Sequence, residues 1–234
     1  MKIRIKFSKH GNVKYIGHLD LQRYFQKAMR RAEIDIAYTT GFSPHQIMSF
    51  AAPLGVGLES NGEYMDIEVN SFTGSKDTVD RLNAVQAEGI HILSAKVLPE
   101  GAGNAMASVA AAGYSIRFKE GREPVFDWEK TISDFFALQS IPYVKETKKS
   151  TIEMNLKDGI YLLECRDHAM NMLIDASSSG NIKPAMVVQA FLAHHHEILQ
   201  ENSLIITRED TYTNVGTREV PDLVPLDAVG TEEE

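Results

Sequence analysis

The sequence predicts an α+β protein built from two ferredoxin-like units in tandem, with antiparallel sheets and helices on one face of each sheet. Over residues 1–102, strand-like and helix-like patterns follow the order strand, helix, strand, strand, helix, strand. This is the βαββαβ order of a ferredoxin-like domain. A similar order with one additional hairpin follows over residues 114–210, where YSIRFK (114–119) resembles IRIKFS (3–8). These two observations define the predicted architecture.

The elements of the first unit are assigned from their hydrophobic periodicity. Ile3, Ile5 and Phe7 alternate with basic residues, as in a half-buried strand. Residues 18–32 place their apolar side chains on one helical stripe, without a Pro or Gly to interrupt it. The remaining elements are expected as strands at 46–50, 64–69 and 90–98 and a helix at 75–88.

The second unit is separated from the first by a segment of small, uncharged residues at 103–113. We expect a linker there, although its alanines could also form a short helix. Residues 211–234, with two prolines and a terminal TEEE, are expected to form a solvated acidic tail. Between them we expect helices at 127–138 and 184–194 and strands near 143–144, 151–156, 160–165, 171–176 and 203–208.

Composition limits the classes of function. The chain has 234 residues, 43% of them hydrophobic, which is enough to build large cores. No apolar run approaches the roughly 20 residues that span a bilayer, and the N-terminus does not resemble a signal peptide. We therefore expect a cytoplasmic protein without a membrane partner. Because Cys165 is the single cysteine, the chain alone can form neither an internal disulfide nor an iron–sulfur cluster held by several thiolates. We expect Cys165 to be a buried small hydrophobic residue.

Charge is distributed unevenly along the chain. The formal net charge of −8 argues mildly against a nucleic-acid partner. Residues 1–50, however, hold nine Lys/Arg and three Asp/Glu, whereas residues 201–234 hold two Lys/Arg and nine Asp/Glu. The average therefore conceals a basic region near the N-terminus.

Five short motifs lie within residues 1–70: His18-Leu19-Asp20-Leu21, Arg30-Arg31-Ala32, Gly41-Phe42-Ser43-Pro44-His45, Pro53-Leu54-Gly55 and Gly62-Glu63-Tyr64-Met65-Asp66. Together they resemble a bacterial radical-SAM-linked family of unknown function. The resemblance implies a radical SAM protein as partner and brings no established activity. Because the chain lacks CxxxCxxC, an iron–sulfur cluster and S-adenosylmethionine would belong to that partner, and no cofactor is expected here.

The predicted helix at 18–32 carries the strongest electrostatic signal. Arg23, Lys27 and Arg30 fall opposite its apolar stripe, with Arg31 on the flank, and Asp20 is its only acidic residue. Such a face could bind the phosphate backbone of an RNA. The alternative is the ordinary solvated face of an amphipathic helix.

The loop that contains His45 is expected to be stiff. Gly41 permits a sharp turn, while Pro44 removes a backbone donor and biases Ser43 towards an extended conformation. Gly41, Ser43 and Pro44 would thus present His45 in a defined direction, which suits binding or proton transfer.

His18, at the start of the helix, would lie near free backbone N–H groups that favour an anion. Two histidines there, with Arg23 close by, would resemble the metal-free sites of ferredoxin-like RNA endonucleases. The alternative is that His18 caps the helix and His45 forms a hydrogen bond across its loop.

Three functions follow from these features. The first is a non-catalytic accessory or RNA-binding module that works with a radical SAM protein. The second is a metal-free RNA-processing enzyme that uses His18 and His45, and the third is a protein-only adaptor; whether the chain is an enzyme stays open. No metal site is expected, since His194, His195 and His196 are consecutive and diverge by about 100° on a helix. At a helix C-terminus their imidazolium forms would be favoured.

Overall fold

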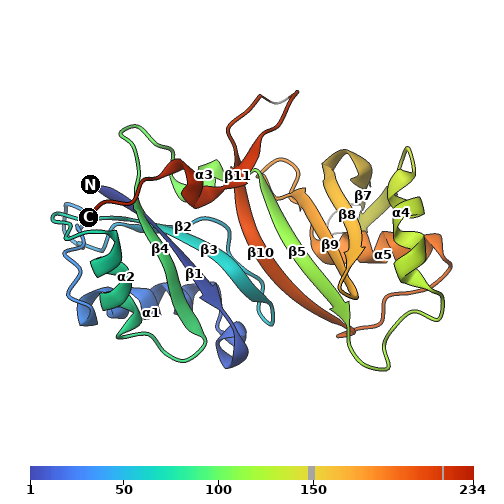
Figure 1. Cartoon of the computed structure of the whole chain (residues 1–234), viewed down its shortest axis with the longest axis horizontal. Helices are drawn as coiled ribbons and strands as arrows, with labels where there is room; N and C mark the ends of the chain where they lie inside the picture. The colour runs from blue at the N-terminus through green and yellow to red at the C-terminus, as the bar shows by residue number, and fades with distance from the viewer. Residues whose placement is uncertain (147–150, 218) are drawn as a thin grey trace. The chain divides into compact units, whose positions relative to one another are not determined.

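The computed structural model describes residues 1–146, 151–217 and 219–234 (Figure 1). Within these ranges the fold is mixed α+β, with five α-helices and antiparallel strand pairs, so the predicted class is confirmed. The chain divides into two compact units: unit 1 comprises residues 1–110 and 208–234, and unit 2 comprises residues 111–207. None of the helices in the described ranges is long and apolar enough to cross a membrane.

Unit 1 contains a sheet with β1 at its centre. β4 and β3 flank β1, and both β2 and β10 pair with β3. The α-helices and strands of this unit are β1 (Lys2–Lys9), α1 (His18–Arg31), β2 (Met48–Phe50), β3 (Glu59–Glu68), α2 (Ser75–Asn83), β4 (Ile90–Val97), α3 (Ala105–Ser108), β10 (Leu204–Asn214), which begins in unit 2, and β11 (Leu223–Pro225). Gly62 allows β3 and β10 to approach closely, because a Cβ there would lie 2.8 Å from the Asp210 Cα.

One face of this sheet is apolar and is covered by α1 and α2 (Figure 1). Ile3, Ile5 and Phe7 of β1 are fully buried beneath these helices, as their alternation predicts. α1 contributes Leu21, Phe25, Ala28 and Met29 to the same core. Because α1 buries this stripe, its opposite side faces water.

The other face of the sheet carries a buried polar network. Arg4 Nε and Nη2 donate to the two carboxylate oxygens of Asp66 at 2.8 and 3.0 Å, so a basic residue of β1 is paired with its cross-strand neighbour on β3. Lys6 Nζ lies 2.7 Å from Asp210 Oδ2 on β10. Tyr64 donates its hydroxyl to Asp210 at 2.6 Å, and burial together with this carboxylate raises the pKa of Tyr64.

The C-terminal segment is folded against this polar face, which differs from the solvated tail expected for 211–234. β11 pairs with β10, and a 3-10 turn, η3 (Leu226–Val229), follows with Leu226 fully buried. Arg4 Nη1 donates to the Leu226 carbonyl oxygen at 2.9 Å, and Thr231 forms a bridge with Val97. The acidic composition was misleading, because Asp227 accepts hydrogen bonds from Tyr64 and Ser94.

Truncating Leu226 to alanine should therefore lower the free energy of unfolding by about 2–5 kcal/mol, since it opens a cavity in a packed site. Chemical denaturation monitored by circular dichroism measures this loss. Val220→Ala is the control, because Val220 lies in the same segment and is 74% exposed. Equal effects of the two substitutions would contradict a packed C-terminal segment.

In unit 2, β9 lies between β5 and β8, and the first residues of β10 lie at the other edge of β5. β6 and β7 form a separate antiparallel pair outside this arrangement. The α-helices and strands of unit 2 are β5 (Ala111–Phe118), α4 (Trp128–Ala137), β6 (Pro142–Glu146), β7 (Thr151–Asn155), β8 (Ile160–Arg166), β9 (Ala169–Asp175) and α5 (Pro184–His194). The alternating residues Ala112, Tyr114 and Ile116 of β5 share a core with α4 and α5.

The segment expected as a linker, 103–113, is largely structured. The α-helix α3 occupies 105–108, in line with the alternative that its alanines form a short helix, and β5 begins at Ala111. Ala105, Ala111 and Ala112 are buried. Small side chains here reflect close packing rather than flexibility.

Candidate functional site

The water-facing side of α1 presents three cations, Arg23, Lys27 and Arg30, which we call the cationic face; all three are exposed. Arg23 is 3.3 Å from Asp20, but both side chains are about 70% exposed, so this pair is weak. Lys27 makes no hydrogen bond or ion pair with the described residues. The cationic face is therefore only slightly neutralised by its surroundings.

Arg31, the fourth predicted cation, differs from the other three. Its Nη2 donates to the Val85 carbonyl oxygen at 3.2 Å, and its guanidinium lies 5.7 Å from the centre of the Tyr24 ring. It is held against the region that follows α2. Arg31 is thus less available to a partner than the cationic face is.

The loop that contains His45 is attached to α1. Tyr38 and Gln46 form a β-bridge at its base, and the Thr39 N–H donates to the His45 carbonyl oxygen at 2.9 Å. Gln46 is buried and donates from Nε2 to the Gln26 carbonyl oxygen of α1 at 3.2 Å. Gly41 has a φ of 117°, which favours glycine. The 39–45 loop is therefore closed by hydrogen bonds and fixed beside the cationic face.

Two aromatic side chains are exposed in this region. Phe42 is fully exposed at the tip of the 39–45 loop, next to the exposed Ser43 and Pro44. Tyr38 is 46% exposed, and hydrogen bonds from Gln46 and then Arg30 lower the pKa of its hydroxyl. An aromatic ring that contacts water while its backbone is held in place is a surface on which a base can stack.

His45 stabilises its own loop. Its Nδ1 lies 3.1 Å from the Thr39 Oγ1, and its backbone N–H donates to that same oxygen at 3.1 Å. This is the hydrogen bond across the loop that was the alternative interpretation of His45. His45 is exposed, and it belongs to the same loop as Phe42.

His18 has a different environment. It does not cap α1, because the N-cap residue is Gly17, and its ring instead packs edge-on against Phe50 at 5.4 Å. The 39–45 loop is attached at Gln26, two turns or about 12 Å further along the helix. In the described part of the chain, no contact joins His18 to His45.

A buried ionic cluster lies beneath His18. Arg208 Nη1 lies 3.0 Å from Glu63 Oε1 and donates to the Ala52 carbonyl oxygen at 2.8 Å, and Lys9 Nζ donates to the Ile16 carbonyl oxygen at 3.0 Å. Burial lowers the pKa of Lys9 and raises the pKa of Glu63. The void that Lys9 and Glu63 share with His18 measures about 10 Å³, the size of one water molecule. The cluster therefore has no room for a substrate.

Neither the exposed Phe42 nor the buried ionic cluster was identified from the sequence. Phe42 could have been noticed as an aromatic residue inside a Gly-Ser-Pro turn. The pairing of Glu63 with Arg208 joins residues 145 positions apart, and no local pattern indicates it.

The other residues considered in the sequence analysis, the histidines at 194–196 and Cys165, are not part of the cationic face or the 39–45 loop. His194 ends α5, and His195 stacks on Phe126 at 4.1 Å. Burial lowers the pKa of His195, so the imidazolium form expected at this helix end is disfavoured for that residue. Cys165 is half-buried. Within the described ranges, no three His, Cys, Asp or Glu side chains are grouped to hold a metal.

Comparison with known families gives one match. The model of a family described as an uncharacterised protein conserved in bacteria (DUF2344) matches residues 2–184. The matched range includes α1, the 39–45 loop and most of unit 2. No curated protein matches the chain.

Proposed function

Since the chain belongs to this family of uncharacterised proteins conserved in bacteria, we propose that it is a non-catalytic RNA-binding module that assists a radical SAM protein. The observation that carries the proposal is the cationic face with Tyr38 and Phe42 exposed beside it. The partner is proposed from the resemblance of the N-terminal motifs, and it would supply the cluster and S-adenosylmethionine. The complex would act in the cytoplasm.

The proposed RNA is single-stranded. Guanidinium and ammonium groups contact phosphates in any nucleic acid, whereas a projecting phenyl ring can stack only on a base that is not enclosed in a duplex. Phe42 and the cationic face together therefore favour an unpaired segment. The sheet face of unit 1 is not the binding platform in this proposal, because Arg4, Tyr64 and Asp66 are buried there.

We also propose that each unit is ferredoxin-like. What supports this for unit 1 is the order β1-α1-β2-β3-α2-β4 and the arrangement of β4, β1, β3 and β2. In unit 2, β10, β5, β9 and β8 follow the corresponding arrangement, with the β6–β7 hairpin inserted. In this fold the helix after the first strand is exposed along its outer side, which is where α1 carries its cations.

The RNA-binding proposal is tested by fluorescence anisotropy with a labelled single-stranded RNA and with its duplex, across a salt series. Three phosphate contacts should give a slope of about −2 in log K against log salt for the single strand. The duplex should bind more weakly. Absence of single-strand binding by the wild-type protein at low salt would refute the proposal.

Replacing Phe42 by alanine should weaken single-strand binding by about 1–3 kcal/mol, the contribution of one stacked base. The salt slope should stay the same, because no charge is removed. Val56→Ala, which truncates another exposed apolar side chain of unit 1, is the matched control. Unchanged affinity of the Phe42→Ala variant in the same anisotropy assay would show that Phe42 does not stack on a base of the RNA.

The module is favoured over a metal-free RNA-processing enzyme because His18 and His45 have separate sets of contacts. An acid–base pair must reach the same phosphodiester. A His18→Ala, His45→Ala variant should therefore leave labelled RNA as intact as the wild-type protein does on a denaturing gel. RNA cleavage by the wild-type protein that this variant loses would establish the enzyme instead.

A further inference from the structure

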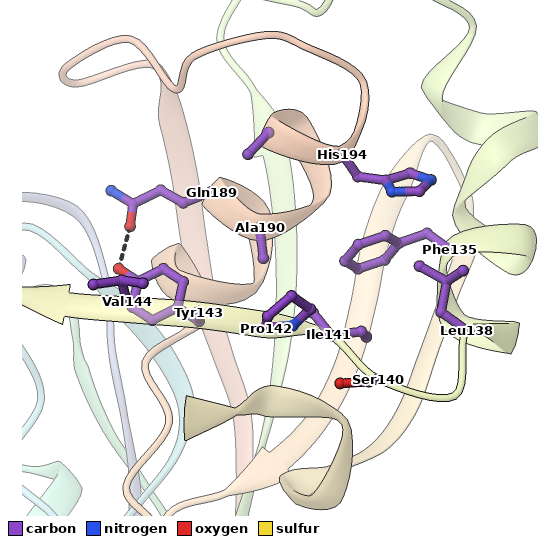
Figure 2. A pocket seen from close by; sticks show the side chains of 11 residues that line it. Phe135, Leu138, Ser140, Ile141, Pro142, Tyr143, Val144, Gln189, Ala190 and His194 are labelled. Carbon is purple, nitrogen blue, oxygen red and sulfur yellow. Dashed lines mark hydrogen bonds between the residues drawn. The ribbon is translucent and has the colours of Figure 1, made fainter. Parts of the chain in front are cut away.

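A cavity of about 600 Å³ opens in unit 2 between α4, β6 and α5 (Figure 2). This volume lies within the roughly 300–1,000 Å³ that small-molecule sites occupy. All of its lining residues belong to unit 2. It is thus separate from the cationic face.

The cavity exists because α5 has small side chains on the face that lines it. Ala190 and Ala193 are three positions apart, so they share one face of the helix, and both line the cavity. On its inner face the same helix fills the core with Val187, Val188 and Phe191, all fully buried. In Figure 2 the Ala190 side chain points towards Pro142 of β6, with no larger group between them.

The walls of the cavity are apolar and aromatic. Phe135 and Leu138 line the side of α4, and Ile141 and Pro142 line the side of β6 (Figure 2). None of the lining residues is a Lys, Arg, Asp or Glu. A charged ligand would lose its hydration here without gaining a partner of opposite charge, which favours an uncharged one.

Hydrogen-bonding groups lie at the two ends of the cavity. At one end, the Tyr143 hydroxyl donates to Gln189 Oε1 at 2.6 Å, which leaves the Gln189 amide N–H groups without a partner among the described residues. At the other end, the His194 ring packs against Phe135, with centroids 5.7 Å apart, and makes no hydrogen bond within the described ranges. Figure 2 shows Gln189 and Tyr143 at one end and His194 at the other, and these side chains can donate or accept hydrogen bonds to a ligand.

We propose that this cavity binds a small, uncharged, planar heteroaromatic molecule. Its ring would lie among Phe135, Ile141 and Ala190, where aromatic contacts add to apolar burial. Its ring nitrogens or carbonyl groups would meet Gln189 and His194. A saturated ring of the same size would lose the edge-to-face contacts with Phe135.

The test uses benzimidazole as the planar probe and cyclohexanol as the saturated one, with NMR of alanine methyl groups in the full chain. Benzimidazole should shift the Ala190 and Ala193 methyl signals saturably and bind more tightly than cyclohexanol. Ala190→Leu should weaken benzimidazole binding by about tenfold or more, because the larger side chain fills the space. Ala185→Leu, the same enlargement at a half-buried α5 residue outside the cavity, should leave affinity unchanged.

Thermal unfolding confirms that each variant is folded, and Ala193→Leu replaces Ala190→Leu if the latter is not. Methyl signal shifts that do not saturate with benzimidazole, or that are the same in the Ala190→Leu variant, would refute the proposed binding site. Binding of cyclohexanol as tight as that of benzimidazole would overturn the planar class of ligand. If dilution of the protein alone moves the same methyl signals, a second copy of the chain occupies the cavity and the proposal fails.

Discussion

Reversing the three charges of the cationic face, by Arg23→Glu, Lys27→Glu and Arg30→Glu, should abolish the binding of single-stranded RNA. The change removes three proposed phosphate contacts and adds three repulsive charges at the same positions. Any residual binding should lose the slope of about −2 with log salt expected for three contacts. Because all three side chains are exposed, the fold should be retained, and circular dichroism together with the anisotropy titration checks both expectations.

The control for this variant reverses three exposed cations elsewhere, by Lys76→Glu, Lys130→Glu and Arg166→Glu. Each of these side chains is at least 67% exposed and lies near a carboxylate. The control changes the net charge of the chain by the same amount. Equal loss of binding in the two variants would mean that RNA responds to overall charge and not to α1. Arg31→Glu should have a smaller effect than Arg30→Glu, since Arg31 is engaged with Val85.

Local patterns predict well the helices and strands that bury one apolar side in the core. β1 alternates Ile3, Ile5 and Phe7 with basic residues, and α1 has one apolar stripe, so both elements and their buried sides follow from periodicity. The cationic face follows by the same reasoning, because a helix that buries one side exposes the other. The neighbouring positions of Arg4 and Asp66 also follow, once β1 and β3 are placed side by side.

What could not be predicted depends on contacts between distant parts of the chain. The C-terminal segment is acidic and contains prolines, yet Leu226 is buried and its carbonyl oxygen accepts from Arg4, 222 positions earlier. The cavity of unit 2 arises from Ala190 and Ala193, which in sequence are simply good helix formers. Whether a small residue marks close packing or an empty space depends on what lies opposite it, and only the tertiary structure supplies that information.

The largest effect on stability is expected at the Arg4–Asp66 pair. Asp66→Ala should lower the free energy of unfolding by about 3–5 kcal/mol, since it leaves a buried guanidinium without its counter-charge. Arg4 is 1% exposed, and Asp66 also accepts a hydrogen bond from the Ala105 N–H at 2.6 Å. Urea denaturation at neutral pH measures this loss.

Two comparisons separate the loss of the charge pair from a general effect of truncation. Asp20→Ala, which breaks the exposed pair with Arg23, should change stability far less, because water already screens that pair. An Arg4→Met, Asp66→Leu double variant should be more stable than Asp66→Ala alone, since it removes the stranded charge along with its partner. If the double variant were the less stable of the two, the cost of Asp66→Ala would lie in lost packing and in the Ala105 hydrogen bond, and the guanidinium would tolerate burial without a carboxylate.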